Sequence, residues 1–173
     1  MDKPQNIQLD NMKVRFHNLG GRPNDYGTVQ LDVSFEVSDE LAEQLRRDGY
    51  YVSDWTPKND PDAEPIHLFK GIISFKDKNG QLKPRHLRPE INLVMEGSNT
   101  GVKMSESMLI SNFGNAKRLE ILYADEVQIN AANKPRKDGQ GYTAYINSMF
   151  LICKNKSKYN IAAEEDDEDF DED

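Results

Sequence analysis

The sequence has very little of several patterns that mark particular classes of protein. No apolar run approaches the roughly 18 residues that a membrane-spanning helix needs, and residues 1–13 contain no apolar stretch typical of a signal peptide. The only cysteine is Cys153, so an internal disulfide and a cysteine-rich zinc site are both excluded. We therefore expect a cytoplasmic protein in which this cysteine is a small buried apolar residue.

Motifs of catalysis and cofactor binding are also missing. The sequence contains no phosphate-binding GxxxxGK[ST], no dinucleotide fingerprint, no GxSxG and no HExxH. The three histidines, His17, His67 and His86, lie at unrelated spacings, which argues against a metal site. The sequence therefore predicts a protein that is not an enzyme and that needs no cofactor.

Positive charge is in deficit over the whole chain, but one segment causes the deficit. The formal net charge is −8, and nine of the 30 acidic residues lie in residues 164–173, which contain no lysine or arginine. The rest of the chain carries 22 basic and 21 acidic residues, a net charge of +1. A segment this acidic has too little apolar surface to fold. We therefore predict one domain over residues 1–158 and a disordered acidic tail over residues 159–173.

The sequence does contain a series of β-strand patterns. Apolar residues occupy every second position at Val29, Leu31, Val33, Phe35 and Val37. Further strands are predicted over residues 12–19, 66–76, 89–96, 119–131 and 143–153. One short helix is expected between Ser38, a good N-cap, and Gly49, which can end it. Strands without alternating helices indicate an all-β barrel or sandwich.

The strand over residues 12–19 is predicted to have one apolar and one basic face. Met12, Val14 and Phe16 alternate with the basic residues Lys13 and Arg15. Since successive side chains of a strand point to opposite sides, this pattern places Phe16 on the apolar face with Met12 and Val14.

Basic and aromatic residues suggest a binding surface, because a protein that holds single-stranded nucleic acid needs cations for phosphates and flat rings for bases. Between residues 70 and 88 six basic residues accompany a single acid, Asp77. A second basic cluster occupies the loop over residues 131–141, with tyrosines after it, and Trp55 follows the predicted helix. The alternative is that the charges are ordinary solvated surface and the rings are core. The predicted binding residues are Lys70, Lys76, Lys78, Lys83, Arg85, Arg88, Lys134, Arg136, Lys137, Tyr142, Tyr145 and Trp55.

Together these segments resemble a known family. The lysine-rich turn FKDKNG, the strand INLV with the polar loop after it, and the final apolar strand followed by an acidic tail with Phe170 are similar to the OB-fold single-stranded DNA-binding proteins of short-tailed bacteriophages. The resemblance spans most of the chain. It implies a five-stranded OB-fold barrel with one short helix, whose groove coats single-stranded DNA in the bacterial host during DNA replication, recombination and repair.

The same resemblance implies roles for loops and tail. The loops over residues 20–27 and 131–141 would form the mouth of the barrel. The tail would compete with DNA for the groove and contact the phage polymerase and helicase/primase through Phe170, Asp169 and Asp171. A homodimer is also implied.

Two other classes of function remain open. An acidic tail on an all-β domain also suits a chaperone or scaffold that binds basic proteins, although the basic stretch between residues 70 and 88 would repel such a ligand. A nuclease would need an acidic metal cluster on the barrel.

Overall fold

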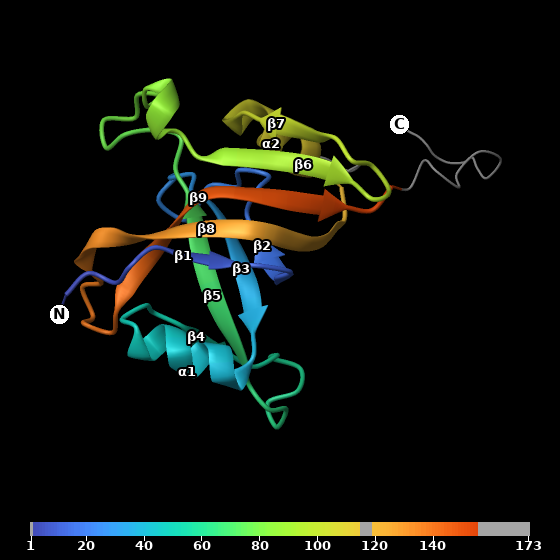
Figure 1. Ribbon diagram of the computed structural model, residues 1–173. Helices are drawn as coiled ribbons and strands as arrows, with labels where there is room; N and C mark the ends of the chain where they lie inside the picture. The colour runs from blue at the N-terminus through green and yellow to red at the C-terminus, as the bar shows by residue number, and fades with distance from the viewer. Residues whose placement is uncertain (1, 115–118, 156–173) are drawn as a thin grey trace.

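The structure, a computed structural model, describes residues 2–114 and 119–155. In this part of the chain nine β-strands form one mixed sheet, accompanied by two α-helices and one 3₁₀-helix (Figure 1). In chain order the elements are β1 (Ile7–Leu9), β2 (Lys13–His17), β3 (Leu31–Val37), α1 (Asp39–Arg47), β4 (Ser53–Trp55), β5 (Ile66–Ile73), η1 (Arg85–Leu87), β6 (Glu90–Met95), β7 (Gly101–Met104), α2 (Glu106–Phe113), β8 (Ile121–Pro135) and β9 (Tyr142–Cys153).

Strand β9 connects the parts of the sheet. It pairs with β8 in a long antiparallel hairpin, with β5 in parallel near its start and with β6 in parallel along its second half. Strand β5 approaches β9 closely at Gly71, where an added Cβ would lie 2.6 Å from a side-chain carbon of Ile146. Helix α1 lies at one end of the sheet, and α2 lies with β6 and β7 at the other (Figure 1).

The predicted all-β class is confirmed, but the five-stranded barrel is not. The ladders join the strands in the order β1-β8-β9-β5-β3-β2, so the sheet is not closed. A single isolated bridge between Met12 and Ala124 connects the segment before β2 to β8. Strands β1, β4 and β7 were not predicted, because three or four residues are too few to show an alternating pattern.

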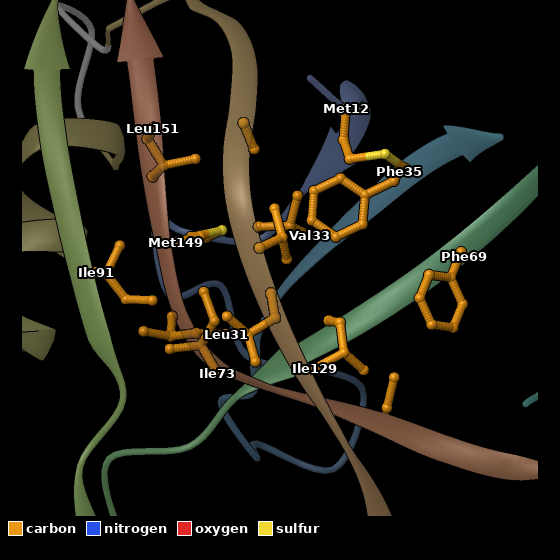
Figure 2. Close-up of a cluster of buried hydrophobic side chains, with 14 of the residues drawn as sticks. Met12, Leu31, Val33, Phe35, Phe69, Ile73, Ile91, Ile129, Met149 and Leu151 are labelled. Carbon is orange, nitrogen blue, oxygen red and sulfur yellow. The ribbon is translucent and has the colours of Figure 1, made fainter. Parts of the chain in front are cut away.

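The core lies on one face of the sheet. Leu31, Val33, Phe35 and Val37 of β3 are all buried, as their alternation predicts, whereas Val29 lies before the strand and is 47% exposed. Figure 2 shows side chains from β3, β5, β6, β8 and β9 pointing toward one another, including Phe35 and Phe69, which are fully buried. Cys153 is fully buried as well, as predicted, and burial raises the pKa of its thiol to about 11.

Helix α1 forms where the sequence predicts it. The Oγ atom of Ser38 accepts a hydrogen bond from the backbone N–H of Leu41 at 3.1 Å, and acidic and basic residues occupy the first and last turns. Gly49 follows with a positive φ of 103°.

The prediction of a single helix is wrong. Residues Glu106–Phe113 form α2, which Ser105 caps through its Oγ atom and which buries Leu109 and Phe113. Its eight residues show a weaker amphipathic pattern than those of α1, so the sequence did not reveal it. In the described residues no helix combines the length and the apolar character needed to span a bilayer.

Helix α1 is tied to the sheet by a histidine between two carboxylates. His67 Nε2 lies 2.7 Å from Oδ1 of Asp39 in α1, and its Nδ1 lies 2.6 Å from Oδ1 of Asp54 in β4. Asp54 also accepts a hydrogen bond from Arg46 at 3.1 Å. The hydrogen bond with Asp54, reinforced by Asp39, raises the pKa of His67, while His67 and then Arg46 lower the pKa of Asp54.

These pKa shifts predict a pH-dependent stability. Because the pKa of His67 is raised on folding, its contribution is complete below the unfolded-state value of about 6.5 and is lost as pH rises through the folded-state value. The melting temperature should therefore fall as the pH rises above about 6.5. Calorimetry of the wild-type protein and of His67→Gln, which cannot titrate, measures the difference. Parallel pH profiles for the two proteins would contradict this assignment.

Candidate nucleic-acid interface

A groove with a volume of about 840 Å³ collects lysines from distant parts of the chain. Its walls come from the segment over residues 74–89, from β8 and β9, and from the N-terminal segment. The charged residues that line it are Lys3, Lys76, Lys78, Lys83 and Asp77. We call this feature the lysine groove. Three of its four lysines are among the predicted binding residues, and the fold brings them together with Lys3.

The one acid of the lysine groove has a structural role. Oδ1 of Asp77 accepts hydrogen bonds from the backbone N–H groups of Asn79 and Gln81, at 2.9 and 3.0 Å. Gly80, with a φ of 79°, completes the tight turn that the sequence predicts at this position. The carboxylate thus closes the turn that carries Lys78. Lys76, which also lines the groove, pairs with Glu106 of α2 at 3.3 Å.

Tyr145 supplies an exposed ring beside these lysines. It lines the lysine groove, is 37% exposed and lies opposite Ile72 in the ladder between β5 and β9. Residues at alternate positions of these strands face outward, away from the core. We call this side of the sheet the outer face. Lys70 lies on the same face, two residues before Ile72.

A β-bulge in β2 changes the direction of its side chains. Val14 pairs with Phe35 and points to the core, but the register then shifts at Arg15, so that Phe16 pairs with Ser34. Phe16 consequently lies on the outer face and is 42% exposed. The prediction that Phe16 shares one apolar face with Val14 is wrong, because one extra residue in a strand reverses the facing of every residue after it.

Phe16 belongs to an aromatic and basic cluster on the outer face. Its ring centroid lies 5.0 Å from that of Trp55, with an interplanar angle of 72°. The Cζ atom of Arg15 lies 5.7 Å from the Phe16 ring centroid and 5.4 Å from that of Trp55. Trp55 is half-buried and packs against Phe16.

A smaller pocket of about 280 Å³ lies in the middle of the outer face. The polar residues that line it are Ser34, Tyr51, Ser53, Lys70, Arg136, Tyr142 and Thr143. Cζ of Arg136 lies 3.8 Å from the Tyr51 ring centroid, and its Nη2 atom pairs with Asp138 at 2.8 Å. Stacking and ion pairing fix the guanidinium at the edge of the pocket. We call this feature the central pocket.

The structure disperses the other predicted residues. Arg85 is exposed on η1, and Nε of Arg88 donates to the carbonyl oxygen of Lys83 at 2.7 Å, which supports the groove wall. Lys134 and Lys137 are exposed around the turn between β8 and β9. Tyr142 is 96% buried, so its ring offers no free face to a base. Phe170, Asp169 and Asp171, with the whole predicted tail, lie outside the described residues.

Comparisons with known proteins found resemblance only among solved structures. No protein-family model matches the chain, and no curated protein matches it. A C-terminally truncated single-stranded DNA-binding protein from bacteriophage Enc34 has a TM-score of 0.48 and 9% identity over 87% of both chains. The Enc34 protein in complex with single-stranded DNA gives 0.48 and 10% identity, over 87% of this chain and 88% of that one. The single-stranded DNA-binding protein gp2.5 from bacteriophage T7 has a TM-score of 0.33 and 11% identity, over 95% of this chain and 100% of that one.

These solved structures are bacteriophage single-stranded DNA-binding proteins. The sequence motifs resemble the same family.

The sequence missed several residues of the interface. Lys3 reaches the groove from a segment with no strand pattern, and Phe16 is exposed only because of the bulge. Tyr51 stacks on Arg136, whereas its neighbour Tyr50 is buried in the core. The sequence pattern does not show which of these two adjacent tyrosines faces the surface. Within the described residues no three histidine, cysteine, aspartate or glutamate side chains are grouped so as to hold a metal ion.

Proposed function

We propose that the protein binds single-stranded DNA without base specificity. The observation that carries this proposal is the lysine groove, in which four lysines and one acid line a channel beside the exposed ring of Tyr145. Lysines attract the phosphates of a nucleic acid, and an aromatic ring can stack on any base, since each base has a flat face.

Single strands are favoured over duplex by this arrangement. In a duplex the bases already stack on each other and pair in the interior, so Tyr145 cannot reach a base face. In a single strand the bases are free to stack on the ring, while the phosphates remain near Lys76, Lys78 and Lys83.

We extend the proposal to the biological setting that the sequence resemblance implies. The protein would coat exposed single strands in the cytoplasm of a bacterial host during replication, recombination and repair of phage DNA, without enzymatic activity and as a homodimer. Residues 164–173, with nine acidic residues, would compete with DNA for the basic groove and contact the phage polymerase and helicase/primase through Phe170.

The test compares single-stranded and duplex oligonucleotides at several salt concentrations. If four to six basic residues contact phosphates, the slope of log affinity against log salt should be about −3 to −4, because each contact to a single strand contributes roughly −0.7. Fluorescence anisotropy with labelled oligo(dT) and a matching duplex measures both affinities. Tighter binding to the duplex would contradict the proposal, and so would a gel shift with a basic protein but none with oligo(dT).

A further inference from the structure

We propose that the outer face carries a second nucleotide subsite, in which Phe16 stacks on a base while the central pocket holds the adjoining phosphate. The inference rests on the proposed binding of single-stranded DNA. It adds a place on the protein, about three strands away from Tyr145, that the DNA strand reaches after it leaves the lysine groove.

The sheet register places the two parts of this subsite side by side. Phe16 pairs with Ser34, and Ser34 pairs with Lys70. The parallel ladder joins Gly71 to Ala144, so the preceding residues Lys70 and Thr143 are neighbours, and both line the central pocket. One row across β2, β3, β5 and β9 therefore presents a ring, a hydroxyl, an ammonium group and another hydroxyl on the same face.

The central pocket has the chemistry of a phosphate site. Lys70 supplies a positive charge, Arg136, which is paired with Asp138, supplies guanidinium N–H donors, and the hydroxyls of Ser34, Ser53 and Thr143 supply uncharged donors. Among the described residues Lys70 forms no salt bridge, so its charge is available to an anion. Arg136 is held in place by Tyr51 and Asp138, which reduces the entropy lost when it binds a ligand.

Phe16 supplies the stacking surface. The bulge at Arg15 turns Phe16 outward and leaves it 42% exposed. In this position the ring contributes less hydrophobic stabilisation to the fold than it would in the core. Bulges commonly re-aim side chains beside binding sites. Arg15 lies over the Phe16 ring and Trp55 makes a T-shaped contact with it, and a base can pack against the part of the side chain that stays exposed.

The two subsites lie within reach of one short strand of DNA. The backbone positions of Phe16 and Tyr145 are separated by three strand spacings and two residues along the strands, about 16 Å in a flat sheet. The bases of a stacked strand lie about 3.4 Å apart, so about five nucleotides span that backbone distance. Oligonucleotides of about 16 residues, near the upper end of the range for one OB-type domain, cover both subsites.

The test separates stacking from charge on the outer face. The probe is a 16-residue oligo(dT), since one OB-type domain covers about 4–16 nucleotides. Phe16→Leu keeps an apolar side chain but removes the ring. It should weaken binding of this probe by about 5- to 100-fold without changing the salt slope. Phe16→Tyr should bind like the wild-type protein. Lys70→Gln should instead make the slope shallower by about 0.7. Val102→Ala, at an exposed apolar position on β7, is the matched control and should change neither quantity.

A measurement without mutation tests the same subsite. Trp55 is the only tryptophan and contacts Phe16, so saturation of the wild-type protein with oligo(dT) should change its emission. The subsite is disproved if the wild-type protein binds oligo(dT) while Phe16→Leu binds equally tightly, or while Trp55 emission stays constant. Failure of the proposed function is a different result, since the wild-type protein would then not bind oligo(dT) at all.

Discussion

Replacing Lys76, Lys78 and Lys83 together by glutamine is expected to weaken binding of single-stranded oligonucleotides about 100-fold at about 0.1 M salt. All three line the lysine groove, and they are three of its four lysines. Each lysine that neutralises a phosphate contributes roughly 0.7 to the salt slope, so the loss of three contacts should reduce the slope to about −1 to −2. Titration of labelled oligo(dT) over a series of salt concentrations measures both effects.

A matched triple variant distinguishes the groove from net charge. Lys58, Lys103 and Lys154 are exposed elsewhere, in the loop before β5, on β7 and after β9. Their replacement by glutamine removes the same three charges but should leave the salt slope close to that of the wild-type protein. Both variants should keep the wild-type melting temperature, since the Lys76–Glu106 pair is a surface salt bridge worth about 0–1 kcal/mol. Equal loss of affinity in the two variants would refute a localised groove.

Removal of residues 164–173 is expected to tighten DNA binding. The deletion takes the formal net charge from −8 to +1, because it removes nine negative charges and no positive ones. If this segment competes with DNA, it weakens DNA binding by a factor that grows with its effective concentration at the groove divided by the tail–groove dissociation constant. A tether of this kind gives about 1 mM, so a tail–groove dissociation constant of about 0.1 mM would weaken DNA binding about tenfold.

Chain length allows this competition within one molecule. Asn155 lies two residues after the end of β9 and ten residues after Tyr145. Ten residues of extended strand place these two residues about 33 Å apart. The chain from Asn155 to residue 173 has a contour length of up to roughly 60 Å, which exceeds that separation.

Two comparisons decide whether the acidic segment acts in this way. The gain in affinity on truncation should be largest at low salt, because salt screens the tail and the DNA alike. Phe170→Ala keeps all nine charges, so it should leave DNA affinity unchanged and weaken only the binding of a replication protein. A truncated protein that binds oligo(dT) no more tightly than the full chain at low salt would rule out competition.

Sequence patterns predicted the elements whose burial repeats regularly. The alternation in β3 and the capping signals of α1 are local properties, so the chain displays them without knowledge of its partners. The bulge at Arg15 depends on how β2 pairs with β3, and no residue type in β2 signals it. The pairing of β9 with β5 and β6 is likewise a long-range property that places Lys70 beside Thr143.

The part of the candidate site that depends on local sequence could also be predicted. Lys76, Lys78 and Lys83 are close in sequence, and the turn at Gly80 keeps them close in space. The alternation of side chains along a strand also separates the two tyrosines of β9. Tyr142 and Tyr145 are three residues apart in one strand, so they must point to opposite sides, and only Tyr145 is on the outer face.

The burial of Cys153 makes this chain a convenient subject for site-specific labelling. The thiol is fully buried in β9 and its pKa is raised to about 11, so at neutral pH it is protonated and shielded from maleimide and iodoacetamide reagents. The native protein therefore has no reactive cysteine to remove. A cysteine introduced at Tyr26, which is 91% exposed, would be the one site that takes a dye.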